Sequence, residues 1–372
     1  MPASRSRPMP EVSRLVVKVG SSSLVDGSGS VSGPKLDKVV DEVARAVTGG
    51  RRVVLVSSGA IASGLGALGL VRRPSRLAAL QAAAAVGQGL LMSAYAGRFA
   101  ARGVVAAQVL LTQDDVLRRP HFVRAQATLD HLLGAGVVPV VNENDTVATE
   151  EITFGDNDRL AALVAIMVRA DLLVLLSDVD GIYTDDPRTP GARLLEEVRD
   201  ASSVRARDAR TGLGSGGMES KLQAAMLATA AGIPAVVAAA GAPDVLGRVL
   251  GGEAIGTWLP ARAGRQRARK AWLAFVMEPR GRIVVDPGAE RAVRDGGRSL
   301  LAAGVVGVEG GFSAGDPVEV SGVDGSAFAR GLARVSAADL ARLAGGNGAG
   351  SHPAEVIHRD ELVVTAPRAG AI

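Results

Sequence analysis

The chain has 372 residues, too many for one ordinary hydrophobic core, so about two domains are expected. It lacks cysteine, and its four histidines show no zinc-ligand spacing, which excludes disulfide frameworks and thiolate metal sites. Lys and Arg exceed Asp and Glu by 42 to 38, but residues 271–372 hold 10 basic against 12 acidic side chains, so this tail lacks the basic footprint of a nucleic-acid-binding domain.

The first 13 residues (MPASRSRPMPEVS) are expected to be a disordered lead-in. No signal-peptide pattern opens the chain, and no apolar run reaches about 18 residues, the length that a membrane-spanning helix needs. We therefore expect a soluble, cytoplasmic protein without a membrane partner.

An apolar strand is predicted at residues 14–20 (RLVVKVG), interrupted by Lys18. A buried lysine is costly unless its ammonium group reaches a partner or an anionic ligand. The alternative is an edge strand, where a lysine opposes aggregation. Gly20 and three serines follow the strand, as in a turn that cradles phosphate.

Residues 35–50 have helical spacing and end in glycine, and residues 52–56 form a second apolar strand followed by the turn SSGA at 57–60. This alternation of strand and helix predicts parallel βαβ units. Ser58 then lies at the carboxyl end of a strand, where it serves a ligand or only caps the next helix. The Gly-x-Gly-x-x-Gly patterns at 64–69 and 212–217 lack the preceding strand of a dinucleotide site, and we reject both.

The polar loop at residues 142–158 (NENDTVATEEITFGDND) is the stretch richest in candidate ligand-binding side chains. An Ala-rich helix over 75–102, a strand over 104–111, a helix over 121–136 and a strand over 137–141 precede it, and a helix over 159–168 follows. The loop's carboxylates and amides suit a small zwitterion, whereas the alternative, Asx turns and a helix cap, needs only one or two such residues. The candidates are Asn142, Asn144, Asp145, Asp156, Asn157 and Asp158.

Two further stretches point to a nucleotide. Residues 172–188 (LLVLLSDVDGIYTDDPR) read as a buried strand and a polar turn with Ser177 and Asp178, which holds the adenine or ribose side of a nucleotide or is a plain turn. Residues 211–232 (TGLGSGGMESKLQAAMLATAAG) join a glycine-rich loop to a helix that carries Lys221, a combination of backbone donors, helix dipole and point charge that suits phosphate. The alternative for the glycine-rich part is a flexible linker.

Strands at 235–239 and 254–259 complete this first domain, and charge rises while periodicity lapses at 261–270. Beyond that point, short strand-like pieces at 282–288, 304–310 and 317–322 are separated by glycine. This texture is typical of a small β-barrel-like domain of about 80–90 residues.

Together these motifs resemble the glutamate 5-kinases, a family with the amino-acid kinase fold and a C-terminal PUA domain. The matching blocks are LVVKVGSS (15–22), VLVSSGAI (54–61), AAVGQ (84–88), VNENDTVAT (141–149), FGDNDRLAALVA (154–165), LLSDVDGIYTDDPR (175–188) and GSGGMESK (214–221). In the tail they are DPGA (286–289), SLLAAGV (299–305), FSAGD (312–316), ARGL (329–332) and EVIHRDEL (355–362). The resemblance covers residues 13–362, and the NEND and GDND blocks together are specific to this family.

The resemblance implies an α/β fold: a three-layer αβα sandwich around a mainly parallel sheet, followed by a small β-rich PUA-like domain. The implied limits are a lead-in at 1–13, a kinase domain at 14–260, a linker at 261–274, a PUA-like domain at 275–362 and a tail at 363–372. The implied reaction transfers the γ-phosphoryl group of ATP to the side-chain carboxylate of L-glutamate, the first step of proline biosynthesis.

Site residues are carried over by the same resemblance. Lys18 and Lys221 are the expected charge clamps on the transferred phosphoryl group, and Asp158 is expected to hold both lysines. Glutamate is expected to contact Ser58, Asn142, Asp145, Asp156 and Asn157. ATP is expected to contact Lys18, Gly20, Ser177, Asp178, Ser215, Gly216, Gly217, Met218, Glu219, Ser220 and Lys221. Mg²⁺ is expected to bridge the phosphates of ATP, bound mostly through phosphate oxygens and water.

The resemblance also implies a homo-oligomer, a dimer or tetramer, with proline as an inhibitor. The sequence departs from the family at Thr153, which stands where a basic residue is usual, and at Ser177, Ser215 and Ser220, which replace Thr but keep the hydroxyl. Two alternatives stay open: a kinase for another acid or a nucleotide, and an RNA-binding protein with an inactive kinase domain. The intact lysines and Asp158 argue against the second.

Overall fold

The structure is a computed structural model that describes residues 6–26, 31–70, 72–112, 115–116, 118–147, 157–199, 217–261, 279–345 and 355–365. The chain divides into two compact units, the larger made of residues 1–116 and 120–263 and the smaller of residues 264–372 with 117–119. Each unit is considered by itself. The predicted linker at 261–274 lies outside the described residues except for its first position, so the predicted domain limits stay predictions.

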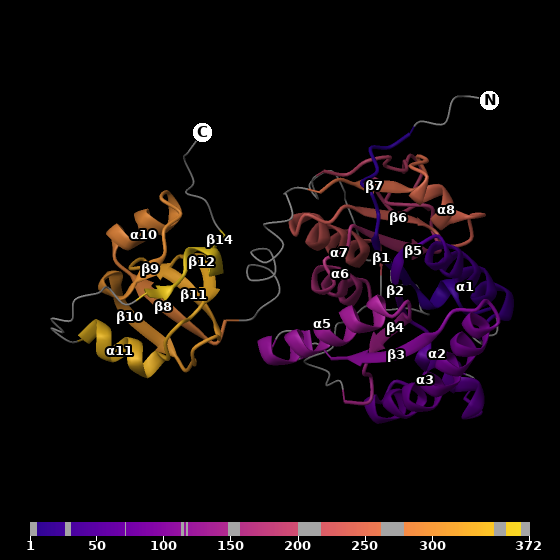
Figure 1. Ribbon diagram of the computed structural model, residues 1–372, viewed down its shortest axis with the longest axis horizontal. Helices are drawn as coiled ribbons and strands as arrows, with labels where there is room; N and C mark the ends of the chain where they lie inside the picture. Colours follow the sequence, from indigo (N-terminus) through magenta and orange to yellow (C-terminus); the bar gives the residue numbers. More distant parts are fainter. Residues whose placement is uncertain are drawn as a thin grey trace. The chain divides into compact units, whose positions relative to one another are not determined.

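A seven-stranded sheet forms the centre of the larger unit, with the strand order β3-β4-β2-β1-β5-β6-β7 (Figure 1). The strands are β1 (Arg14–Val19), β2 (Arg52–Ser57), β3 (Ala106–Leu111), β4 (Val138–Glu143), β5 (Leu172–Ser177), β6 (Ala235–Ala239) and β7 (Thr257–Leu259). Neighbouring strands run parallel except β7, which runs antiparallel to β6. The predicted mainly parallel sheet is confirmed, and all its parallel strands place their carboxyl ends at one edge, where ligands bind in open α/β sheets.

Helices cover both faces of this sheet. Figure 1 shows α1 and α8 on one side and α6 and α7 on the other. The helices of this unit are α1 (Gly33–Thr48), α2 (Ala60–Ala67), α3 (Leu77–Ala100), α5 (Arg119–Gly134), α6 (Asn157–Met167), α7 (Met218–Ala230) and α8 (Val245–Leu250), with a 3₁₀ turn, η1, at Ser21–Ser23. Successive side chains of a strand point to opposite faces, and those of β1, β4 and β5 are almost all buried, so the centre of the sheet is covered on both sides, as expected for parallel strands. The edge strand β3 is only partly buried.

Strand β1 lies in the middle of the sheet, between β2 and β5. Its residues Val17 and Val19 join the core on the side of α1. Lys18 lies between them and therefore projects to the opposite face, which is covered by α6 and α7. The alternative of an edge-strand lysine is wrong, because β1 is paired along both of its sides.

Helices α2 and α3 approach each other at two glycines. A Cβ atom on Gly64 would lie 1.9 Å from the carbonyl oxygen of Ala83, and one on Gly87 would lie 1.8 Å from that of Ala60. Gly64 and Gly66 belong to α2 and not to a strand-to-helix turn. The first Gly-x-Gly-x-x-Gly pattern thus includes a helix-packing contact, whereas most of the second, at 212–217, lies outside the described residues.

Helix α3 is long and apolar enough to cross a membrane by length and composition, with a mean hydropathy of 1.4 over 18 residues. In this structure it packs against α1, α2 and β3, and it buries Tyr95 and Phe99 completely. Helices of soluble proteins pass the same composition test, so this feature is weak evidence for a membrane span.

The smaller unit has a five-stranded sheet, ordered β10-β8-β11-β12-β14, and a two-stranded sheet of β13 and β9. Its elements are β8 (Gly281–Val285), α10 (Pro287–Arg294), β9 (Leu300–Leu301), η4 (Ala302–Gly304), β10 (Val305–Gly310), β11 (Pro317–Gly322), β12 (Ala327–Leu332), α11 (Ala337–Gly345), β13 (Glu355–Ile357), η5 (Arg359–Glu361) and β14 (Leu362–Val364). The unit has its own apolar core, centred on Val318, Val320 and Phe328. The expected strands near 282, 304 and 317 are present, but the first ends at Val285, because Asp286 caps α10.

Candidate active site

A buried cluster of three ionisable side chains lies at the carboxyl edge of the large sheet. The Lys18 Nζ atom is 2.5 Å from Asp158 Oδ1, and the Lys221 Nζ atom is 3.2 Å from Asp158 Oδ2. The Asp158 side chain is 0% exposed, and those of Lys18 and Lys221 are 3% and 8% exposed. Ser220 adds a hydroxyl that donates to Asp158 Oδ2 at 3.2 Å. The structure therefore brings together the three residues that were predicted to be catalytic.

Three elements that are distant in the sequence produce this cluster. Lys18 comes from the central strand β1, Asp158 from the first turn of α6, and Lys221 from the first turn of α7. The N-terminal end of a helix favours negative charge, which stabilises the Asp158 carboxylate and makes the end of α7 suitable for an anion. Burying charged groups costs free energy even when they are paired, so a buried ion cluster contributes little to stability. Such clusters are common at functional sites, which favours a functional role for this one.

A network of side-chain amides lies beside the charged cluster. Asn157 Nδ2 donates to Ser58 Oγ at 2.8 Å, to Asn142 Oδ1 at 2.9 Å and to the Ser57 carbonyl oxygen at 3.3 Å. Asn157 Oδ1 is buried and has no hydrogen-bond donor among the residues that the structure describes. This network unites Ser58, Asn142 and Asn157, three of the residues predicted to bind substrate, next to Asp158.

The loop boundaries predicted for this region need two corrections. Asn142 belongs to β4, which extends to Glu143, and Asn157 and Asp158 belong to α6. The sequence placed all three in the loop because polar residues rarely continue a buried strand, and because Asn and Asp are as common in turns as at the start of a helix. Regular backbone on both sides holds these side chains more firmly than a loop would.

Two residues of α3 that were given no role in the sequence analysis support this network. Gln88 Oε1 accepts a hydrogen bond from Asn142 Nδ2 at 2.9 Å. The Tyr95 hydroxyl is 2.8 Å from Ser57 Oγ, and burial raises the pKa of Tyr95, which keeps it protonated. Only the AAVGQ block, which contains Gln88, offered a signal in the sequence.

The described part of the predicted nucleotide site lies around the same edge. Gly20 follows β1, Ser177 ends the neighbouring strand β5, and Ser177 Oγ donates to Asp178 Oδ1 at 3.1 Å. Gly217 precedes α7, which begins at Met218. The Glu219 side chain accepts a hydrogen bond from Gln223 within α7. Ser215 and Gly216, like Asp156 and Thr153, lie outside the described residues.

Asp145 is the remaining described residue that was expected to contact glutamate. It follows β4 and is partly buried, and this burial raises the pKa of its carboxyl group, while Arg73 acts in the opposite direction. A carboxylate that is poorly solvated gains more from an incoming cation than an exposed one does. Binding of an ammonium group would therefore stabilise the Asp145 carboxylate.

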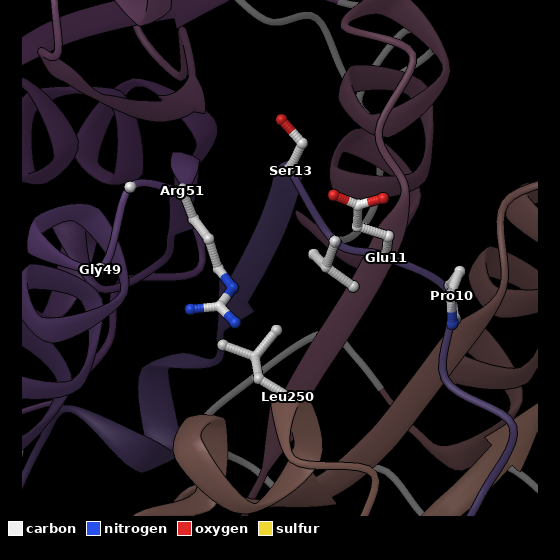
Figure 2. A pocket seen from close by; sticks show the side chains of 8 residues that line it. Pro10, Glu11, Ser13, Gly49, Arg51 and Leu250 are labelled. Carbon is white, nitrogen blue, oxygen red and sulfur yellow. The ribbon is translucent and has the colours of Figure 1, made fainter.

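Figure 2 shows a cavity of about 380 Å³ at the other end of the same strands. It is lined by residues that precede β1 and β2 and by the end of α8, among them Pro10, Glu11, Ser13, Gly49, Arg51 and Leu250. None of the predicted site residues lines it. Arg51 Nη1 lies 3.3 Å from the position of a Cβ on Gly49, the residue after α1, so the guanidinium group is beside the negative end of that helix.

Comparison with known proteins identifies the family. The model of the amino acid kinase family matches residues 13–239, and that of the PUA domain matches residues 281–351. The chain belongs to the amino acid kinase family. The predicted fold class, an α/β kinase domain followed by a strand-rich PUA domain, is therefore confirmed.

Curated relatives match this amino acid kinase along nearly its whole length. It is 51% identical over 369 residues to the glutamate 5-kinase of Streptomyces coelicolor, which covers 96% of this chain and 98% of that protein. It is 50% identical over 362 residues to the glutamate 5-kinase of Salinispora arenicola, covering 94% and 97% of the two chains. The same enzyme of Cutibacterium acnes is 50% identical over 364 residues, covering 95% and 92%.

Proposed function

We infer that this protein is a glutamate 5-kinase, an ATP-dependent phosphotransferase that acts on a carboxyl group. It transfers the γ-phosphoryl group of ATP to the side-chain carboxylate of L-glutamate and produces L-glutamyl 5-phosphate, the first step of proline biosynthesis. The observation that carries this conclusion is the match at about half identity, over nearly the whole chain, with proteins of that name. The geometry at the carboxyl edge of the sheet supports it.

The nucleophile of this reaction needs no general base. A glutamate side chain has a reference pKa of about 4.3 and is already ionised at pH 7. The barrier comes instead from bringing an anionic carboxylate against an anionic phosphate, so the enzyme must position both and neutralise charge. A carboxylate oxygen forms the new bond to the γ-phosphorus, the bond to the bridging oxygen breaks, and ADP leaves.

Lys18 and Lys221 are suited to this task. Both ammonium groups point to one buried carboxylate, that of Asp158, and so converge on one place from β1 and α7. We assign the lysines to the transferred phosphoryl group and the bridging oxygen, and Asp158 to holding them before ATP arrives. Fixed charges that are already in place cost no rearrangement during the reaction.

The amide network is assigned to glutamate. Asn157 is within hydrogen-bond distance of both Ser58 and Asn142, and Asp145 and Asp156 would supply carboxylates for the α-ammonium group. A zwitterion needs both donors and acceptors, and this set contains both.

ATP is assigned to Gly20, to Ser177 and Asp178, and to residues 215–221. Mg²⁺ would neutralise the phosphates and would be held mostly by phosphate oxygens and water. Within the described ranges, no three His, Asp or Glu side chains gather into a cluster that could hold a metal ion.

Homo-oligomerisation, inhibition by proline and a cytoplasmic location stay proposals that come from the family resemblance. The second candidate function, a kinase for another acid or a nucleotide, shares the lysine cluster, but N-acetylglutamate and UMP, unlike L-aspartate, carry no free α-ammonium group. The buried Asn157 Oδ1 and the partly buried Asp145 favour an amino acid.

The test is a comparison of acceptors. Purified protein with ATP and Mg²⁺ should release ADP with L-glutamate and much more slowly with L-aspartate, N-acetylglutamate or UMP. Trapping the product with hydroxylamine should give a hydroxamate from L-glutamate, because its product is an acyl phosphate, and none from UMP. Turnover with one of the other three acceptors, and none with L-glutamate, would contradict the proposal.

A further inference from the structure

We propose that Gln88 is a positioning residue: through Asn142 it sets the orientation of the Asn157 amide, and thereby how strongly the site selects for an α-ammonium group. The proposal rests on the glutamate kinase activity proposed above. It concerns a residue that has no expected contact with substrate or ATP.

The first step is the orientation of Asn142. This side chain is 3% exposed, so its amide donor needs a partner inside the protein. Gln88 Oε1 accepts from Asn142 Nδ2 at 2.9 Å, and the Glu143 backbone N–H donates to Asn142 Oδ1 at 2.9 Å. These two contacts agree on one orientation, with Oδ1 toward Glu143 and Nδ2 toward α3.

The second step passes this orientation to Asn157. Because Asn142 presents an oxygen atom, Asn157 must present its nitrogen, and it does so at 2.9 Å. The same nitrogen contacts Ser58 Oγ at 2.8 Å. Asn157 Oδ1 therefore turns away from the network, buried and without a donor in the described part of the chain. An acceptor left in that state favours a ligand with a donor group.

The third step is the placement of Gln88 itself. Gly87 precedes it and allows α3 to contact α2 so closely that a Cβ at Gly87 would lie 1.8 Å from the carbonyl oxygen of Ala60. Two turns further along α3, the Tyr95 hydroxyl contacts Ser57 Oγ, and the Ser57 carbonyl oxygen accepts from Asn157. Helix α3 thus contacts the residues of the amide network at two places, through Gln88 and through Tyr95. Only the Gln88 contact determines which end of the Asn142 amide faces Asn157.

Removing the acceptor should expose this role. In Gln88→Leu the buried Asn142 donor loses its partner, so the Asn142 and Asn157 amides no longer have a single favoured orientation. We expect the KM for L-glutamate to rise by about 5- to 150-fold, the range that corresponds to an unsatisfied buried group, with the KM for ATP unchanged. Discrimination between L-glutamate and glutarate, which lacks the amino group, should fall by a similar factor.

Gln88→Glu keeps an acceptor oxygen for Asn142 Nδ2, and it replaces the Nε2 donor by a second, negatively charged carboxylate oxygen. If Gln88 acts through Asn142, this variant retains most of the discrimination against glutarate. If Gln88 contacts the substrate through Nε2, both variants lose it equally, and the proposal is overturned. Gln126→Leu is a matched control, because Gln126 Nε2 donates to the Met167 carbonyl oxygen away from the site; its KM for L-glutamate should not change.

Different outcomes contradict the proposed function and the proposed role of Gln88. Wild-type protein that ignores L-glutamate but uses another acceptor contradicts the proposed function. Wild-type protein that uses L-glutamate, together with a folded Gln88→Leu variant of unchanged KM and unchanged discrimination, contradicts only the role of Gln88. Thermal stabilisation by L-glutamate in the absence of ATP gives a second readout of affinity that does not depend on turnover.

Discussion

The two ends of the same central strand hold buried carboxylates in different ways. At the amino end of β1, Asp171 Oδ2 accepts from the backbone N–H groups of Ser13 and Arg14 at 2.9 and 2.8 Å. At the carboxyl end, Asp158 is contacted by the side-chain groups of Lys18, Lys221 and Ser220. Backbone donors cannot leave their acceptor without disturbing the sheet, whereas an ammonium group on a flexible stem can turn toward a phosphate.

A structural and a functional buried carboxylate in one domain can thus be told apart by the kind of donor that contacts each of them. Asp171 also receives support from the sheet itself, because its own backbone N–H donates to the Arg14 carbonyl oxygen at 2.8 Å. Its contacts fix where β1 begins relative to β5. The contacts of Asp158 fix nothing in the sheet but bring together three elements that meet at the ligand edge. The first arrangement should matter for stability and the second for turnover.

The largest effect is expected from the lysines. Lys18→Met and Lys221→Met should each lower kcat by about 10²–10³-fold, since each removes a donor that stabilises charge in the transition state. Glutamate-dependent ADP release by variants shown to be folded measures this. Lys38→Met is the control, because Lys38 contacts Glu42 and the Ala240 carbonyl oxygen at the face of α1 and should keep kcat within about twofold of wild type. Equal losses in all three variants would contradict the distinction.

A stability effect without a rate effect is expected at Asp171. Asp171→Ala removes two hydrogen bonds to a charged acceptor and should lower the free energy of unfolding by about 1.5–3 kcal/mol. Urea denaturation measures this, and kcat at a temperature where the variant is folded should stay near that of the wild type. The exposed Arg248–Glu253 pair offers a comparison, because Glu253→Ala should lower the free energy of unfolding much less than Asp171→Ala does. A large fall in kcat for folded Asp171→Ala would place this residue in the functional class.

The smallest effect, and one of opposite sign, is expected at Asp145. Burial raises its pKa above that of the unfolded chain, so the folded state is penalised by ionisation once the pH exceeds the folded pKa. Asp145→Asn should therefore raise the Tm slightly at pH 7, and this gain should shrink as the pH falls toward about 4. The same variant should raise the KM for L-glutamate about tenfold, because a charge-assisted hydrogen bond is lost. A lower Tm at pH 7 would show that Asp145 is stabilised by partners and is not held ready for a ligand.

The parts of the fold that depend on local pattern could be predicted from the sequence. Alternating apolar strands and helices gave the parallel sheet, and a lysine within an apolar strand marked Lys18 as unusual. The contact between Lys18 and Asp158 could only be expected from the resemblance, because the two residues come from elements that meet through the strand order. That strand order, in which β5 lies beside β1, cannot be predicted from the pattern of any short segment of the sequence.

Gln88 shows where prediction from sequence stops. It lies in an Ala-rich helix whose composition signals only packing, and its partner Asn142 is 54 residues away. Asn142 itself was assigned to a loop because amide side chains usually end a strand. A single hydrogen bond between side chains of two distant elements produces no periodic pattern in the sequence, so it cannot be predicted from hydrophobic periodicity.

The glycine crossing of α2 and α3 has a consequence for protein engineering. Replacing a helical glycine with alanine usually strengthens the helix by about 0.8–1.0 kcal/mol, which makes it a common choice for raising thermostability. At Gly87 the added methyl group would collide with the carbonyl oxygen of Ala60 and push α3 outward, and the residue that follows is Gln88. A substitution chosen to raise thermostability would then lower substrate selectivity, although the replaced residue contacts neither substrate nor nucleotide.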